Sequence, residues 1–276
     1  MITTNFLRDD VDFHKTFTPQ EQYISKILEL AKELYSGNKE EISKITGIPT
    51  GKTSGKVIPH IRYAKYFGLI DYVKEKTNFS LSLTPLGKIV FEEDKYLFEK
   101  NIKLMCHYNI ADKTDGAPIW VFLYHALPFR FDEEISFEMV DKRKEDFFGR
   151  SDVKLDVVRK AYSDEFMRCT SLMTFDKGLV FVSQIAESQY NAVYAYLLLN
   201  TWEKYLPKEK EITVNKLIED LAWGKRLGFQ DDEMMLVLDE LADEGYISLN
   251  KQLYPCTVIK MEESENLLND LYRNLL

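Results

Sequence analysis

The stretch IPHIRYAKYFGLIDYVKEKTNFSLSLTPLG, residues 58–87, is the most informative part of the first 100 residues because its hydrophobic periodicity changes halfway. In its first third the apolar residues recur at helical spacing, and Gly68 is suited to end that helix. The apolar residues then alternate with a period of two, which indicates a strand over 69–73 and a returning strand over 79–83. Thr84, followed by proline, is typical of the start of another helix. The stretch therefore predicts a helix, a β-hairpin and a further helix.

Two more helices are expected before this stretch. Thr18 is suited to cap the first, with Glu21 closing a capping box, and its apolar residues recur at helical spacing as far as Tyr35. A short second helix is expected over 40–46. Three short helices followed by a hairpin are the order of a winged helix-turn-helix, which is predicted for residues 1–100. Any small three-helix module with a hairpin is the alternative.

The rest of the chain is also expected to be mostly helical. Residues 101–206 are rich in aromatic side chains and predict a helical middle region, whereas residues 207–276 predict an acidic, winged-helix-like module. No internal repeat is visible in the sequence. The expected fold class is therefore mainly α, with an N-terminal winged helix-turn-helix, a helical middle region and a C-terminal winged-helix-like module.

Charge is distributed unevenly along the chain. The formal net charge is -9, from 36 basic and 45 acidic residues, yet residues 52–88 hold seven basic side chains and two acidic ones. The helix expected over 231–244 has the opposite character, with seven acidic side chains and no lysine or arginine. A basic patch on an acidic protein indicates a directed contact with an anion, whereas the acidic helix would repel phosphates and is better suited to contact a protein.

The candidate DNA-binding side chains lie on the third helix, the loop before it and the hairpin tip. At about 100° per residue, Val57, Ile58 and Ala64 fall with Ile61 on a core face, and basic and tyrosine side chains fall on the opposite face. The predicted DNA-binding residues are Lys52, Lys56, His60, Arg62, Tyr63, Lys74 and Lys76. Basic side chains among tyrosines suit a surface that holds phosphates and touches base edges. The alternative is an ordinary solvated basic face.

Catalytic and metal sites find little support in the sequence. Residues 47–53 have three residues between their glycines instead of the four of a phosphate-binding loop. The cysteine and histidine at 106–107 are adjacent and not at a chelating spacing. A nuclease-like set of Asp71, Glu93 and Lys95 is a match that chance produces in a chain this charged. The sequence predicts no enzyme activity, no cofactor and no metal.

A cytoplasmic location is expected from three features. No apolar run approaches the roughly 20 residues that a membrane-spanning helix needs. The first residues include Asp9, Asp10 and Asp12 where a secretory signal would be apolar. The three cysteines are too few and too scattered for a disulfide scaffold.

Several short motifs resemble a bacterial protein family. They are Phe13-His14-Lys15-Thr16-Phe17, then Ile61-Arg62-Tyr63-Ala64, then Gly68-Leu69-Ile70 and Thr84-Pro85-x-Gly87. Over about residues 13–200 the chain resembles the family called domain of unknown function four thousand and seven, whose members accompany DNA phosphorothioation (Dnd-type) and related anti-phage gene clusters. It departs from the family pattern at residues 19–23, which lack the family's arginine and tryptophan. The resemblance implies a defence-associated accessory protein and supplies no catalytic residues.

Together these features predict a non-catalytic, DNA-binding accessory subunit of a defence or DNA-modification system. Duplex DNA would be engaged through residues 52–76, and a partner enzyme would be docked through the acidic C-terminal half. The alternatives are a free-standing winged-helix transcriptional regulator, expected as a homodimer, and a scaffold that binds only proteins.

Overall fold

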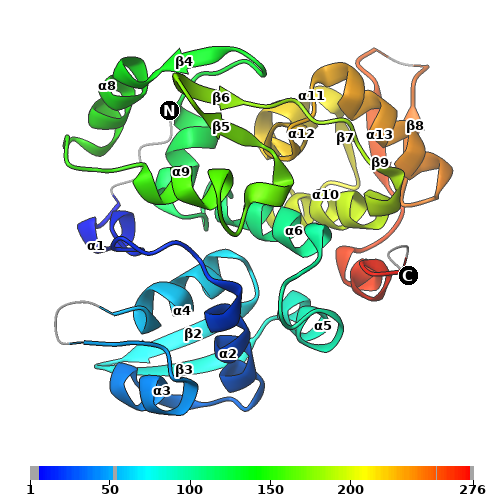
Figure 1. Cartoon of the computed structure of the whole chain (residues 1–276). Coiled ribbons are helices and arrows are strands. Elements are labelled where there is room, and N and C mark those ends of the chain that lie inside the picture. Colours follow the sequence, from blue (N-terminus) through cyan, green and yellow to red (C-terminus); the bar gives the residue numbers. More distant parts are fainter. Residues whose placement is uncertain (1–5, 52–54, 253, 274–276) are drawn as a thin grey trace. The chain divides into compact units, whose positions relative to one another are not determined.

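The computed structural model describes residues 6–51, 55–252 and 254–273 of the 276-residue chain (Figure 1). The chain divides into two compact units, unit 1 over Met1–Phe181 and unit 2 over Val182–Leu276. The boundary falls inside the region 101–206 that was expected to form one helical part.

A three-stranded antiparallel sheet organises the first half of unit 1 (Figure 1). The elements in chain order are α1 (Arg8–Val11), α2 (Glu21–Lys32), β1 (Ser36–Asn38), α3 (Lys39–Thr46), α4 (Val57–Tyr66), β2 (Ile70–Glu75), β3 (Asn78–Leu83) and α5 (Pro85–Glu93). Strand β3 is central, between β1 and β2. Helix α2 packs against β3 and α4. The core is apolar and includes Ile27 and Leu28 of α2, Ile61 and Ala64 of α4, and Leu81 of β3.

Local sequence explains where several of these elements begin. The Asn38 side chain accepts hydrogen bonds from the backbone N–H groups of the second and third residues of α3, and Glu41 returns a bond to the Asn38 N–H at 2.8 Å, which completes a capping box. Thr84 accepts from the Gly87 N–H at 2.9 Å, so the predicted cap of α5 is confirmed. The predicted Thr18 cap was wrong: α2 begins at Glu21, and the Thr18 hydroxyl donates to the Glu165 carboxylate instead.

A second small sheet lies in the other half of unit 1, in the order β4-β6-β5. The elements are α6 (Lys100–Ile110), α7 (Pro118–Val121), the π-helical turn η1 (Phe122–Ala126), β4 (Glu134–Ser136), α8 (Phe137–Phe148), α9 (Asp156–Ser163), the 3₁₀ turn η2 (Arg168–Thr170), β5 (Met173–Phe175) and β6 (Gly178–Phe181). Helix α9 packs against β5, and α8 packs against β4 and β6.

Unit 2 contains the third small sheet, in the order β7-β9-β8. Its elements are the 3₁₀ turn η3 (Ser188–Tyr190), α10 (Asn191–Tyr205), β7 (Glu211–Thr213), α11 (Val214–Lys216), the π-helical turn η4 (Leu217–Leu221), α12 (Trp223–Leu227), α13 (Asp231–Asp243), β8 (Ile247–Asn250), β9 (Thr257–Lys260) and the 3₁₀ turn η5 (Ser264–Asp270). Strands β8 and β9 form an antiparallel hairpin.

The same order of elements occurs three times along the chain. Each copy has a helical segment, a three-residue strand, further helices and a hairpin, and the three-residue strand always pairs with the second hairpin strand. The last residue of each three-residue strand caps the helix that follows, through the side chains of Asn38, Ser136 and Thr213. A residue in extended conformation with a side-chain oxygen can be the last residue of a strand and also accept a hydrogen bond from a backbone N–H of the next helix. One residue therefore both ends the strand and caps the helix.

The prediction of a mainly α fold was wrong. The structure is 52% helix and 14% strand, with three small antiparallel sheets, and is a mixture of both; the winged-helix descriptions of its two ends are not confirmed. The prediction of a helical middle region was also wrong, since the sheet β4-β6-β5 lies in it; β1, β4, β5 and β7 have three residues each and β6 has four, too few to show an alternating pattern. Among the described residues, no helix combines the length and the hydropathy required to cross a bilayer.

Candidate nucleic-acid interface

The segment of residues 8–17, here called the N-terminal strap, lies across α4 of unit 1. The Arg62 guanidinium holds it, because Nη1 donates to the Asp9 carbonyl at 2.7 Å and Nη2 pairs with the Asp10 carboxylate. The same guanidinium lies 5.3 Å from the centre of the Phe13 ring. Further along α4, the Tyr63 hydroxyl donates to the Phe17 carbonyl at 2.9 Å. The strap therefore covers the helix that was expected to face DNA.

This cover changes the orientation expected for three candidate residues. Tyr63 and His60 have no exposed surface. His60 Nδ1 lies 2.6 Å from the Lys56 carbonyl, and burial lowers the pKa of His60 to about 4. The Lys56 ammonium donates to Gln20 Oε1 at 3.3 Å and lies over the rings of Phe17 and Tyr23. The prediction that Tyr63 faces outward was wrong, because a helical wheel cannot show a cover supplied by a distant segment.

The remaining candidates differ in position. Lys74 and Lys76 are exposed on the β2–β3 hairpin, where Lys76 occupies the turn with a φ of 55°. Arg62 is mostly buried, with 15% of its side chain exposed, by its contacts with the strap. Lys52 lies outside the described residues.

Four cations gather around a hollow of about 210 Å³, here called the cationic groove. Its charged lining residues are Asp9, Lys15, Lys39, Arg62 and Lys74. They come from the strap, the start of α3, the middle of α4 and strand β2. One carboxylate, Asp9, also lines the groove, and Asp10 and Glu40 pair with Arg62 and Lys39, so the positive charge that a ligand would meet is mainly that of Lys15 and Lys74. Lys15 and Lys39 lie outside residues 52–76, to which the predicted DNA contacts were confined, so the sequence did not predict this groove.

Two lysines of the cationic groove are available to a ligand. Among the described residues, neither Lys15 nor Lys74 forms an ion pair. Lys39 is more constrained, since its ammonium donates to the Gly51 carbonyl at 3.0 Å and lies 3.6 Å from the Glu40 carboxylate. Within the described part of the chain, the groove thus offers two unpaired ammonium groups beside two that are held in place.

Residues that precede α4 form one wall of the cationic groove. The Lys56 N–H donates to the Pro49 carbonyl at 2.8 Å, and Gly51 and Gly55 both line the groove. A Cβ at Gly55 would come within 2.7 Å of the Thr50 Cα, so this position requires glycine.

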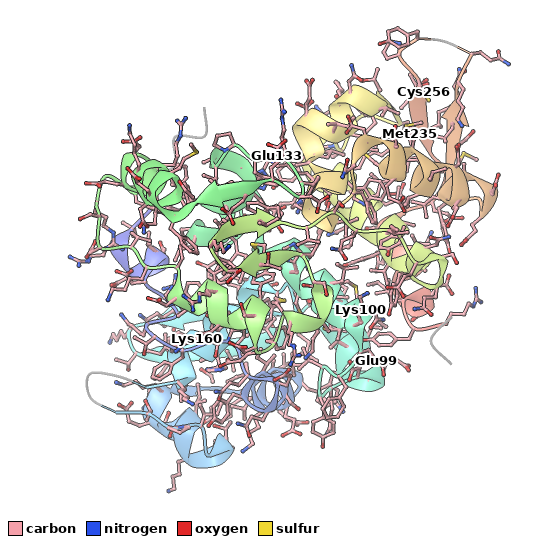
Figure 2. The ribbon with its side chains drawn as sticks, turned by 45° about the horizontal axis from the view of Figure 1, so that its top comes forward. Glu99, Lys100, Glu133, Lys160, Met235 and Cys256 are labelled. Carbon is pink, nitrogen blue, oxygen red and sulfur yellow. The ribbon has the colours of Figure 1, made fainter. Side chains whose placement is uncertain are left out.

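Among the described residues, no group of three or more histidine, cysteine, aspartate or glutamate side chains is arranged to hold a metal ion. Lys95 of the nuclease-like set pairs with Glu29 at 3.1 Å. No disulfide joins the cysteines: Cys106 is buried, Cys169 is exposed, and Cys256, labelled in Figure 2, is half-buried.

The fold has counterparts among solved structures. A crystal structure described as magnesium ion-bound SspB superimposes with a TM-score of 0.74 at 15% sequence identity, covering 96% of this chain and 87% of SspB. The chain has the SspB fold. A second SspB crystal structure gives a TM-score of 0.73 at 16% identity over the same shares of both chains. No family model and no curated protein matches the sequence. The likeness to SspB therefore covers nearly the whole chain and lies in the fold.

Proposed function

We propose that this protein is a non-catalytic accessory component of a bacterial phosphorothioation-type defence system, and that it binds duplex DNA through the cationic groove and the hairpin lysines Lys74 and Lys76. The SspB fold supports the proposal, because SspB belongs to the phosphorothioation (Ssp) system. The sequence motifs described above resemble a family that accompanies such systems, which supports the same association.

The observation that carries the DNA-binding part is the charge of the cationic groove. Arg62 and Lys39 have partners within the protein, whereas among the described residues Lys15 and Lys74 form no ion pair, and their like charges repel each other at one hollow. A phosphate backbone offsets that repulsion, and the release of its counterions favours binding. Lys76 lies on the same hairpin as Lys74, so a backbone that leaves the groove along β2 meets a further ammonium group.

The proposed contact set differs from the one expected from the sequence. Lys15 and Lys39 join Arg62, Lys74 and Lys76, whereas His60 and Tyr63 support the strap from inside and make no contact with DNA in this proposal. The bonds between Arg62 and the strap hold the strap residue Lys15 at the groove.

The partner enzyme is proposed to dock on unit 2, through α13. Several acidic groups of α13 serve the unit itself: Glu233 accepts from the Ala186 N–H, Glu240 accepts from Asn191, and Asp239 pairs with Lys251. Among the described residues, Asp231, Asp232 and Asp243 form no ion pair. These three carboxylates are the groups that a basic surface of a partner would contact.

The test compares two triple variants that carry the same change in charge. Lys15→Ala/Lys74→Ala/Lys76→Ala removes three cations of the proposed contact set. Lys142→Ala/Lys160→Ala/Lys177→Ala removes three exposed lysines elsewhere in unit 1; Lys160 is labelled in Figure 2. Fluorescence anisotropy with a fluorescent mixed-sequence duplex measures the affinity at several salt concentrations.

The expected result follows from the number of phosphates neutralised. Each phosphate contributes about 0.9 to the slope of log K against log salt, so the first variant is expected to flatten the slope by about 2.7 and to weaken binding to all sequences alike. The control variant is expected to keep the wild-type slope. Equal behaviour of the two variants, or no binding by the wild type at low salt, would contradict the DNA-binding proposal.

A further inference from the structure

A second hollow lies next to the cationic groove, on the other side of Arg62. It encloses about 270 Å³ and is here called the tyrosine pocket; the residues that matter to it are Asp10, Arg62, Lys65, Tyr66, Tyr72 and Asp115. Arg62 lines both hollows, so they adjoin at this side chain. A polymer whose backbone occupies the cationic groove therefore has a side group within reach of the tyrosine pocket.

The chemistry of the tyrosine pocket differs from that of the cationic groove. Two cations, Arg62 and Lys65, stand against two carboxylates, Asp10 and Asp115, so its charges balance and it does not favour a phosphate. Tyr66 and Tyr72 are half-buried aromatic walls, and the Lys65 ammonium lies 5.1 Å from the centre of the Tyr72 ring. Burial raises the pKa of both tyrosines, so their hydroxyls stay protonated at neutral pH and are able to donate and to accept. Such a pocket suits a neutral, planar, aromatic ligand that carries both donors and acceptors.

We propose that the tyrosine pocket binds one unpaired nucleobase that carries an exocyclic amino group, while the flanking phosphates lie in the cationic groove. Aromatic side chains bind bases by stacking, and the edge of a base is read by hydrogen bonds. The carboxylates of Asp10 and Asp115 accept from an amino group, which adenine, cytosine and guanine have and thymine lacks. Lys65 is the donor to a ring nitrogen or carbonyl oxygen of the same base.

The proposal requires an unpaired base because a base that is paired and stacked in a duplex does not expose its face and its pairing edge to a protein pocket. A base inside an intact duplex must first be unstacked and unpaired, and this cost is smallest at a bulge, a mismatch or in a single strand. The inference rests on the proposed DNA binding for its phosphate contacts, but the pocket itself is testable without them.

The first experiment measures affinity for three duplexes: fully paired, with one bulged adenine, and with one bulged thymine. The wild type is expected to bind the adenine bulge about tenfold more tightly than the paired duplex, and the thymine bulge with little gain. Tyr72→Ala is expected to abolish the preference and keep the affinity for paired duplex. Asp115→Asn is expected to reduce the discrimination between adenine and thymine. Tyr96→Ala, which changes a half-exposed tyrosine outside both hollows, is the matched control.

The second experiment uses nucleosides, which have no phosphate, and detects binding by saturation transfer in ligand-observed NMR. Adenosine and cytidine are expected to receive saturation from the wild type, thymidine much less, and the adenosine signal is expected to fall with Tyr72→Ala and with Lys65→Ala. Lys65 is exposed, so its replacement leaves the core intact. Circular dichroism verifies that each variant is folded.

The two experiments separate failure of the pocket from failure of the proposed function. Binding to paired duplex with no preference for a bulged adenine and no nucleoside signal would overturn the pocket and leave the DNA-binding proposal standing. Nucleoside binding without duplex binding would support the pocket and overturn the DNA-binding proposal. An adenosine signal that neither variant changes would also overturn the pocket, because the nucleoside would then bind elsewhere.

Discussion

Replacing Arg62 tests whether its guanidinium holds the N-terminal strap on α4. Arg62→Ala removes a bond of 2.7 Å to the Asp9 carbonyl, the pair with Asp10, a bond of 3.2 Å to the Tyr66 hydroxyl and the contact with the Phe13 ring. The carbonyl bond is worth about 1 kcal/mol net, and the long bond to Tyr66 about 0.5. The Asp10 carboxylate is 38% exposed, so solvent screens the pair to at most about 1 kcal/mol. The ring contact adds about 0.5.

The expected loss is therefore about 2–3 kcal/mol of the free energy of unfolding of unit 1. For a unit of this size that corresponds to a fall in Tm of roughly 5–10 °C, which a thermal melt followed by circular dichroism resolves. Arg62→Lys keeps the charge but not the forked geometry, so it is expected to lose about half as much. Arg143→Ala, which removes an exposed arginine of α8, is the matched control with no expected shift. A Tm of Arg62→Ala within 1 °C of the wild type would refute the reasoning.

Three further predictions concern Gly55, the buried histidine and the absence of chemistry. Gly55→Ala places a Cβ within 2.7 Å of the Thr50 Cα, so it is expected to lower the Tm and weaken DNA binding, whereas Gly149→Ala, with nothing within 4 Å of the added Cβ, is expected to leave DNA binding unchanged. The pKa of His60 falls from 6.5 to about 4 on folding, so between these pH values the unfolded chain binds a proton that the folded chain does not. The free energy of unfolding is therefore expected to fall by about 3 kcal/mol as the pH drops from about 6.5 to about 4. His60→Gln is expected to flatten the dependence of Tm on pH over that window. Supercoiled plasmid incubated with the protein and Mg²⁺ or Mn²⁺ is expected to stay intact on an agarose gel; nicked or linear product would contradict the non-catalytic assignment.

The elements that the sequence predicted well are those specified by neighbouring residues. The hairpin of β2 and β3, the end of the third helix near Gly68 and the Thr84 cap each depend on a few adjacent side chains, and all three are present. The strands β1, β4 and β7 were missed because each is specified by its pairing with a distant strand, and the short hairpin β5–β6 was missed inside the region 101–206 that was predicted to be helical. Three residues carry no periodicity of their own.

The candidate site was predicted less well, because a helical wheel describes one helix in isolation. Tyr63 is covered by Phe17, which lies 46 residues earlier in the chain. A signal for this cover was present in the sequence: acidic residues Asp9, Asp10 and Asp12 precede the aromatic strap motif, and Asp10 and Asp12 find their partners in Arg62 and Arg150. Opposite charges in two distant segments, each beside an apolar stripe, are a reason to expect that the segments pair.

The threefold order of elements has a consequence for how such a chain changes over evolutionary time. Each copy pairs its own three strands and caps its own helix, so a substitution at one hairpin turn leaves the backbone ladders of the other two intact. The residues at the turns differ: Lys76 and Thr77 follow β2, Asp176 and Lys177 follow β5, and Lys251 follows β8. The sequence of one turn is therefore able to change without a change in the backbone pairing of the other two sheets, and selection is able to act on the three turns separately.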